Sequence, residues 1–300
     1  MRSFSWFLLA IAGTLLLAAA LAYPVYLLAV AIEPGWAFHR VVTRFWQLTM
    51  LAGIAACVWG LRLTGRDAWG YGLARPRFAT QFGTGLAVGV ATMLAVATLM
   101  IGLGIRQPLQ GLGAAGLAVS LASGLATGLT VGLVEETFFR GLMFSAIRRE
   151  SGARAAILLT AVVYAAIHFL ARTKIPAAEV GPTSGWVLLR GVLRLFGEPA
   201  TMADAFLSLL AVGVLLGMAR QWTGSIAVCI GLHAGWVWVI KATTATTRAA
   251  HDAPLGWLVS RFDGFTGWLV LAWACLLTYL AWHHRHRFLS CAARLSPPAA

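Results

Sequence analysis

Long apolar runs alternate with short polar stretches along most of this 300-residue chain. The runs repeatedly reach the roughly 20 residues that a helix needs to cross a lipid bilayer. Because backbone N–H and C=O groups inside lipid must be satisfied within the spanning segment, the runs predict helices and not open sheets. The pattern predicts eight spans, at residues 5–31, 43–62, 84–105, 114–147, 153–172, 204–220, 224–243 and 265–283.

Composition agrees with this pattern, because 60% of the residues are hydrophobic and only 11% are charged. Such a balance excludes a soluble globule. The predicted fold class is all-α, a polytopic membrane helix bundle of about eight transmembrane helices that forms one integral membrane domain. We divide it into residues 1–112, with three helices and an interfacial segment at 63–83, residues 113–243, with the polar motifs, and residues 244–300, with the last loop, the final helix and a basic tail.

The net charge of +13 is spread over several short loops and both tails. No separate basic domain is evident, so the expected partner of these cations is the anionic surface of a lipid bilayer and not a nucleic acid. Arginine clusters in alternate short loops favour two cytoplasmic termini. The sequence therefore predicts a multi-pass protein of the cell (inner) membrane, with residues 5–31 as an uncleaved first helix, since the apolar run continues to Ile32 without a polar start.

Three polar fragments interrupt the apolar helices, and they are Glu135-Glu136-Thr-Phe-Phe-Arg140, Tyr164-Ala-Ala-Ile-His168 and Gly-Leu-His233-Ala-Gly-Trp236. Each charge at the centre of a membrane helix costs roughly 2.5–3.5 kcal/mol. These groups must therefore pair with one another or line a polar cavity. Glu136 and Arg140 are four residues apart on a helix, so they are predicted to form a pair.

The spacing of the fragments predicts how deep each one lies. If residues 114–172 fold into a hairpin that turns near Ser151, Glu135 and His168 both lie roughly 24–26 Å from the turn. His233 lies only about 15 Å beyond the turn at Thr223. The carboxylate and the first imidazole are thus expected at a common depth, whereas His233 joins them only if its helix tilts.

A carboxylate and two histidines in a low-dielectric cavity fit three kinds of chemistry. The carboxylate can take a proton from water while the imidazoles bind a metal or stabilise an oxyanion. Glu135, His168 and His233 can instead be the three ligands of a divalent metal with an open position for water. A proton relay also uses buried Glu and His residues.

Glycines recur at four-residue spacing in three of the predicted helices. Small residues at this spacing let helix backbones approach closely, and we expect them to pack helices within one bundle. The glycines are Gly124, Gly128 and Gly132, then Gly85 and Gly89, and finally Gly213 and Gly217.

The three polar fragments resemble the CAAX-protease and bacteriocin-processing (CPBP) family of intramembrane endopeptidases, also called the abortive-infection family. The resemblance covers about residues 115–243. It implies that Glu135 activates the attacking water, that Glu136 and Arg140 order the site, and that His168 and His233 bind water, a metal or the oxyanion. It also implies either one divalent metal, with zinc as the first candidate and Glu135, His168 and His233 as its ligands, or a metal-free glutamate mechanism.

Two positions depart from the family pattern. Tyr164 replaces the usual Phe of the second motif, and Val237 replaces the Asn that usually follows the last histidine. The indole N–H of Trp236 or Trp238 is the nearest substitute donor. The chain is therefore interpreted as an endopeptidase that cleaves a membrane-associated protein or peptide near a membrane-inserted or lipidated segment. The alternative is a non-catalytic immunity or partner protein that binds a peptide in the same cavity.

Overall fold

A computed structural model describes most of the chain as helices grouped in two compact units. The N-terminal unit contains residues 1–67 and 165–202, and the C-terminal unit contains residues 68–164 and 203–300. The predicted all-α membrane bundle is confirmed. The described residues are 2–60, 78–111, 113–169, 175–197, 201–250 and 252–285.

The N-terminal unit is built on two long helices, α1 (Arg2–Ile32) and α2 (Phe38–Gly60). A short 3-10 helix (Ala177–Glu179) and α6 (Ser184–Gly197) complete it. Phe38 is buried and its ring meets that of Tyr26 edge to face at 5.2 Å. Helix α6 thus lies between the fifth and the sixth predicted spans. Most of the predicted interfacial segment 63–83 lies outside the described residues.

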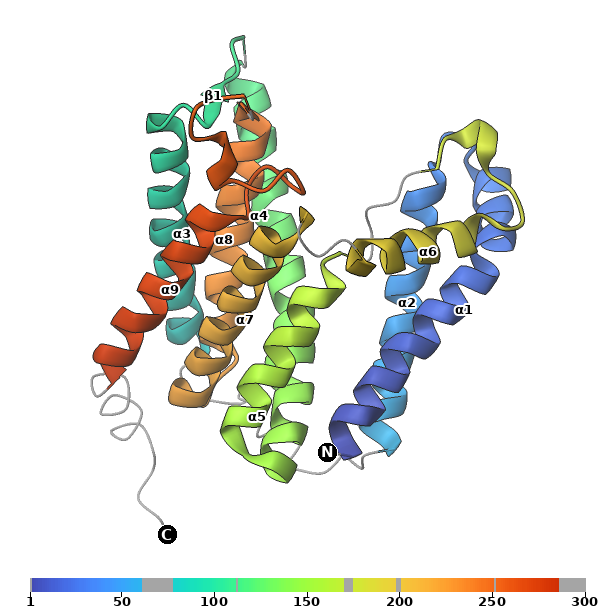
Figure 1. Cartoon of the computed structure of the whole chain (residues 1–300), viewed down its shortest axis with the longest axis horizontal. Coiled ribbons are helices and arrows are strands. Elements are labelled where there is room, and N and C mark those ends of the chain that lie inside the picture. The colour runs from blue at the N-terminus through green and yellow to red at the C-terminus, as the bar shows by residue number, and fades with distance from the viewer. Residues whose placement is uncertain are drawn as a thin grey trace. The chain divides into compact units, whose positions relative to one another are not determined.

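The C-terminal unit contains the remaining elements (Figure 1). In chain order they are α3 (Phe78–Gly102), β1 (Arg106–Pro108), α4 (Ala114–Glu136), a π-helix (Thr137–Met143), α5 (Phe144–Ile167, whose last residues belong to the other unit), α7 (Ala203–Thr223), α8 (Ala227–Thr246), β2 (Thr247–Ala249), a 3-10 helix (Gly256–Leu258) and α9 (Trp268–His283).

Six helical stretches in the described residues are long and apolar enough to cross a membrane. One of them, Ala114–Ile167, contains both the fourth and the fifth predicted spans. The chain turns between these two spans at Gly152, whose φ of +82° is in the left-handed region that glycine adopts without strain. The turn predicted near Ser151 is therefore confirmed, and α9 supplies a shorter apolar helix at the eighth predicted span.

Helix α8 packs closely on α3 and α4 because glycines line both seams. A Cβ atom added at Gly85 or Gly89 of α3 would lie 2.4 Å or 2.5 Å from a carbonyl oxygen of α8. A Cβ atom at Gly128 of α4 would lie 2.5 Å from the carbonyl oxygen of Ala234. The predicted role of the glycine stripes in close packing is thus confirmed, and these seams position the polar residues of α4 and α8.

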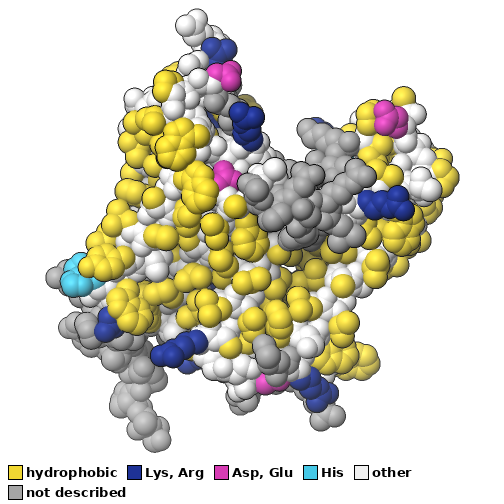
Figure 2. Space-filling model, in the orientation of Figure 1, with side chains coloured by type: hydrophobic (Ala, Val, Ile, Leu, Met, Phe, Trp, Pro, Cys, Tyr) yellow, Lys and Arg dark blue, Asp and Glu magenta, His cyan; other side chains and the backbone are white. Residues whose placement is uncertain are grey.

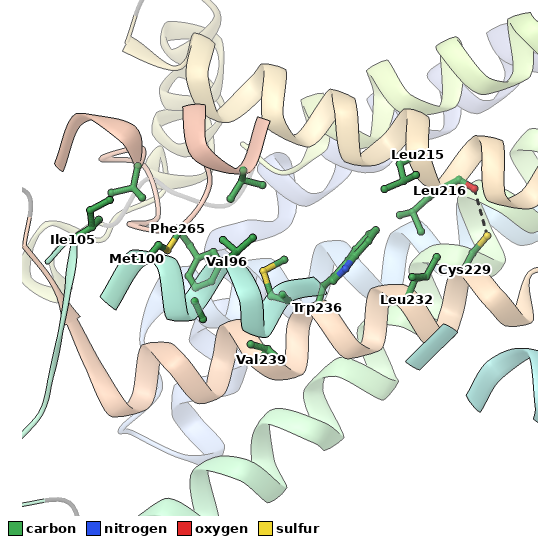
Figure 3. Close-up of a cluster of buried hydrophobic side chains, with 14 residues drawn as sticks. Val96, Met100, Ile105, Leu215, Leu216, Cys229, Leu232, Trp236, Val239 and Phe265 are labelled. Carbon is green, nitrogen blue, oxygen red and sulfur yellow. Dashed lines mark hydrogen bonds between the residues drawn. The ribbon is translucent and has the colours of Figure 1, made fainter. Parts of the chain in front are cut away.

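A buried hydrophobic cluster holds α8 against α3, α7 and the segment that precedes α9 (Figure 3). The Trp236 ring lies between Val96 of α3 and Leu216 of α7, and Met93 of α3 belongs to the same cluster. Burying side chains of this size contributes about 1.5–3 kcal/mol each relative to leaving them in water. The cluster therefore fixes the rotation of α8 about its axis, on which the direction of His233 depends.

A two-stranded ribbon closes one end of the C-terminal unit. In it β1 pairs antiparallel with β2, and Arg106 lies opposite Ala249. The buried Arg106 guanidinium donates to the hydroxyl of Thr247 and to the carbonyl of Gly264, each at 2.7 Å. On the face shown in Figure 2, hydrophobic side chains cover α7 and α9, and the Lys and Arg side chains lie toward the ends, as expected for helices that span a membrane.

Candidate active site

Arg140 lies within a π-helical turn that begins directly after the two glutamates. Helix α4 ends at Glu136, and residues Thr137–Met143 form the π-helix. At its end the amide of Phe144 donates to the carbonyl of Phe139, five residues back. The expectation of an uninterrupted α-helix over 114–147 is therefore corrected. Such single π turns inside α-helices occur frequently at functional sites.

Arg140 is fully buried and makes three contacts of different kinds. Its Nη1 lies 3.2 Å from Glu136 Oε1, and its Nη2 donates to the carbonyl oxygen of Gly213 at 3.0 Å. The Tyr164 ring lies 4.7 Å from the guanidinium carbon. The predicted Glu136–Arg140 pair is thus confirmed. In such a pair, removal of one partner leaves an uncompensated charge and costs about 3–5 kcal/mol.

His233 is oriented by the same glutamate. Its Nδ1 lies 2.8 Å from Glu136 Oε1, so one carboxylate oxygen contacts both the imidazole and Arg140. An ionised carboxylate can only accept hydrogen bonds, so the hydrogen-bond network assigns the proton of the neutral His233 ring to Nδ1, which donates to Glu136. His233 Nε2 then keeps a free lone pair on the opposite side of the ring.

Glu135 differs from Glu136 in its exposure. The Glu135 side chain is 28% exposed, whereas that of Glu136 is fully buried. Glu135 Oε2 lies 4.0 Å from His233 Nε2, which is too long for a direct hydrogen bond. Within the described part of the chain, Oε2 of each glutamate has no hydrogen-bond partner. Glu135 therefore combines a partly exposed side chain with a buried oxygen that lacks a partner, while Oε1 of the fully buried Glu136 is bonded to His233 and Arg140.

The apparent depth mismatch of His233 disappears in the folded unit. The lower end of α5, the helix in which the chain turns, lies lower in the view of Figure 1 than the turn between α7 and α8. Equal counts of residues from the two turns therefore do not correspond to equal depths. The offset between the turns brings His233 to the level of Glu135 and Glu136, within the distances given above.

The second motif is divided between the two units. Tyr164 belongs to the C-terminal unit, and its ring lies edge to face with those of Phe139 and His233 at 5.6 Å and 6.0 Å. It therefore forms an aromatic wall beside the buried charges. His168 follows the end of α5 in the N-terminal unit, and its membership of the site stays a prediction.

Arg220 supports the site, although the sequence motifs did not identify it. It is buried in the last turn of α7, and its Nε donates to the backbone carbonyl of Arg140 at 3.0 Å. A signal was present, because Gly213, Gly217 and Arg220 follow one another at helical spacing. The two glycines pack α7 against Ala161 and Ile157 of α5. Arg220, about one turn after Gly217, is therefore expected to lie on the same inward face of α7.

Neither tryptophan substitutes for the Asn that Val237 replaces. The indole N–H of Trp236 donates to the hydroxyl of Thr92, and that of Trp238 donates to the carbonyl of Leu121, both at 3.0 Å. The hypothesis of an indole donor at the site is therefore wrong. The hydrophobic cluster and the α4 seam hold these rings in other directions.

The predicted metal ligands are only partly brought together. Glu135 Oε2 and His233 Nε2 supply two donor atoms, whereas a catalytic zinc usually has three protein ligands. In the described ranges, no three His, Cys, Asp or Glu side chains gather to hold a metal ion. The residues placed in the C-terminal unit thus do not complete a metal site by themselves.

Comparison with known proteins adds one finding. A family model described as type II CAAX prenyl endopeptidase Rce1-like matches residues 117–239, which include Glu135, Glu136, Arg140, His168 and His233. No curated protein and no solved structure matches the chain.

Proposed function

Since residues 117–239 belong to the Rce1-like family of type II CAAX prenyl endopeptidases, we propose that the chain hydrolyses a peptide bond near a membrane-inserted or lipidated segment. At the level of the family it is an intramembrane CAAX-type protease. One observation carries the finer proposal. Glu136, held by Arg140, orients His233 so that its Nε2 lies 4.0 Å from the partly exposed Glu135 carboxylate.

The gap between Glu135 and His233 suits one water molecule. Two polar atoms 4.0 Å apart can both bond to a bridging water, since each contact then falls near 2.8 Å. Such a water would donate one O–H to Glu135 Oε2 and the other to His233 Nε2. Each acceptor is fixed, so the oxygen lone pair can be directed at a substrate carbonyl.

In the proposed reaction Glu135 acts as the general base. It takes a proton from the water as the oxygen attacks the carbonyl carbon, and it returns this proton to the amine nitrogen as the C–N bond breaks. Positioned proton transfer of this kind contributes about 10²–10⁴-fold to rate. Glu136 and Arg140 do not touch the substrate, and their role is to hold His233 in one tautomer and one direction.

Two parts of the site remain proposals that variants can test. We retain His168 as a donor to the oxyanion or as a third ligand for zinc, together with Glu135 and His233. Bound zinc would supply Lewis-acid activation of the water. His168 belongs to the other unit, so the proton transfers above are assigned to Glu135 and His233 alone, and zinc stays a separate proposal.

A second function is favoured by Val237, which has no hydrogen-bonding group where the family usually has Asn. The chain would then be a non-catalytic partner or immunity protein that binds a peptide in the same cavity. Because Glu135→Gln preserves size and removes the base, it abolishes an enzyme's function and spares a binder's.

The test compares the membrane and secreted peptides of cells that express the wild type or Glu135→Gln at equal abundance. Glu33→Gln, at an exposed position after α1, is the matched control. We expect a peptide terminus that forms with the wild type and the control but not with Glu135→Gln. Identical termini in all three cell lines, with all proteins inserted and folded, would refute the protease and support the binding protein.

A further inference from the structure

An apolar groove lies between α7 and α9, and neither glutamate of the candidate active site lines it. Its volume is about 510 Å³. The side chains that line it are aliphatic, aromatic or sulfur-containing apart from Thr278, and the Thr278 hydroxyl donates to the carbonyl of Ala274 within α9 at 2.7 Å. The groove therefore suits a hydrocarbon ligand and offers it no free hydroxyl proton.

Helices α7 and α9 run parallel along this groove. Near the start of both helices, the amide of Gly267 donates to the hydroxyl of Ser208 at 3.3 Å. Near the end of both helices, the rings of Trp222 and Trp282 lie 6.3 Å apart. The groove thus keeps the same two walls from one end to the other.

The length of the groove matches one leaflet of a bilayer. Its lining runs from Leu207 to Met218 on α7 and from Leu271 to Trp282 on α9. Each interval advances eleven residues along a helix, which corresponds to about 16 Å. Half of the hydrocarbon core of a bilayer is about 15 Å thick. A lipid chain of a single leaflet can therefore lie along the whole groove.

Basic and aromatic side chains gather at one end of the groove. The guanidinium carbon of Arg285 lies 4.4 Å from the centre of the Trp282 ring, and Trp282 lines the groove. The His283 ring stacks on that of Tyr279, another lining residue, with ring centres 6.1 Å apart. Figure 2 shows His and Arg side chains at the lower end of the hydrophobic surface over α7 and α9. Both basic groups thus rest on the aromatic residues of the groove itself.

The charge of Arg285 is available to an anion. Its Nη1 donates to the carbonyl of Trp282 at 3.1 Å, and it makes no ion pair with any residue that the structure describes. A guanidinium has further N–H groups, whose fork matches the oxygens of a phosphate. Arg285 also precedes the C-terminal tail, which the sequence predicts to be cytoplasmic, and anionic lipids give the cytoplasmic leaflet its negative surface potential.

We propose that the groove between α7 and α9 binds one anionic phospholipid. One acyl chain lies along the groove, and the phosphate binds Arg285 and His283 at its end. The site is separate from the proposed proteolysis and does not depend on it. The lipid satisfies both features of the groove, because its chain covers the apolar walls and its headgroup neutralises the cations.

A transmembrane helix of a second protein fits this groove less well. Where helices of this unit pack closely on one another they do so at glycines, as at Gly89 and Gly128. The groove is lined instead by large side chains such as Leu210, Met218 and Tyr279. Backbones cannot approach closely over such residues, whereas a flexible acyl chain can follow their outline. A zwitterionic lipid has the same chains but no net charge, so it gains less from the cations.

The test uses the purified full chain in vesicles of phosphatidylcholine. The probe is a small fraction of phosphatidylglycerol that carries a photoreactive diazirine in one acyl chain, and phosphatidylcholine with the same chain is the reference probe. After illumination, mass spectrometry of the digested protein measures the crosslinks on α7 and α9. This readout locates the chain directly and needs no substrate.

We expect phosphatidylglycerol to label the groove residues about fivefold more than phosphatidylcholine does, the factor that one cation near a membrane surface contributes. Arg285→Gln should reduce this preference to about onefold, and Arg285→Lys should keep most of it. Arg148→Gln removes an exposed arginine elsewhere in the same unit and is the control.

The acyl-chain part of the site is tested at Ala211, which lines the groove. Ala211→Phe fills part of the groove, so it should lower the labelling by both lipids on α7 and α9. Leu158→Phe is the matched control, because Leu158 is exposed on α5. Gel filtration and circular dichroism establish that each variant is folded.

Three results would overturn the site. The first is equal labelling of the groove by both lipids in the wild type, which assigns the groove to bulk lipid. The second is a preference for phosphatidylglycerol that survives in Arg285→Gln. The third is crosslinking of α7 and α9 mainly to a second copy of the chain, which assigns the groove to a protein interface.

Discussion

The two ends of the α4–α8 seam handle charge in opposite ways. At one end Glu136, Arg140 and His233 are almost fully buried, and each is paired within the protein. At the other end Lys241 is exposed beside a row of hydroxyl acceptors and has no charged partner among the described residues. Burial forces pairing because an isolated charge in a low-dielectric interior costs several kcal/mol. An accessible charge has no such requirement and remains available for a ligand.

Replacement of Arg140 should destabilise the paired end more than any other change described below. Arg140→Met removes the partner of the buried Glu136 carboxylate, so we expect the free energy of unfolding to fall by about 3–5 kcal/mol. Denaturant titration in detergent micelles measures it. Arg148→Met is the control, because Arg148 is exposed and its change should stay within about 0.5 kcal/mol. Equal losses for both variants would show that the buried Glu136–Arg140 pair contributes no more to the free energy of unfolding than an exposed arginine does.

The contribution of an oxyanion donor near the paired end can be tested at Val237. Val237→Asn places an amide donor one turn after His233, and an oxyanion donor is worth about 10²–10³ in kcat. We expect cleavage of the substrate peptide to accelerate by up to that factor. The gain should vanish when Glu135→Gln is added, which makes the double variant the control. An unchanged rate would show that Val237 does not face the reacting carbonyl.

The seam that joins the two ends can be opened at Gly128. A Cβ atom there would lie 2.5 Å from the Ala234 carbonyl oxygen, so Gly128→Ala must push α4 and α8 apart. We expect a loss of about 1–3 kcal/mol in the free energy of unfolding, as for other overpacked positions. Gly83→Ala is the control, because nothing lies within 4 Å of that added Cβ. A smaller loss for Gly128→Ala than for Gly83→Ala would contradict the close seam.

Removal of metal should have the smallest effect. Because the proposed general base Glu135 acts on the water without a metal, we expect a chelator to change the cleavage rate by less than about twofold. Metal analysis of the purified protein provides a second readout. One equivalent of zinc that is lost in both His168→Ala and His233→Ala would overturn this expectation and establish His168 as the third ligand.

Much of the fold could be predicted, because lipid imposes simple rules on a chain. Apolar length predicted the helices, and the polar residues around Ser151 predicted the turn that occurs at Gly152. The π-helix at Thr137–Met143 could not be predicted in this way. Hydropathy reports which groups avoid water, and it carries no information on whether an amide bonds four or five residues back.

The site was predictable where it is local in the chain. Glu136 and Arg140 are four residues apart, so their pairing followed from helix geometry alone. The approach of His233 to both glutamates was not predictable, because it depends on the relative heights of two turns. Arg220 was missed for a related reason, since its contact is with a backbone carbonyl on another helix.

By itself the sequence determined the all-α membrane class of the protein, its helices and the Glu136–Arg140 pair, and residues 117–239 match the Rce1-like family model. These depend on composition and on spacing along one helix. Only the tertiary structure decided which oxygen orients His233, where the two indole donors point, and that Lys241 lies beside the hydroxyl groups of α4. Such relations join residues roughly a hundred positions apart, and they exist only after the glycine seams have set the distance and rotation of α4 and α8.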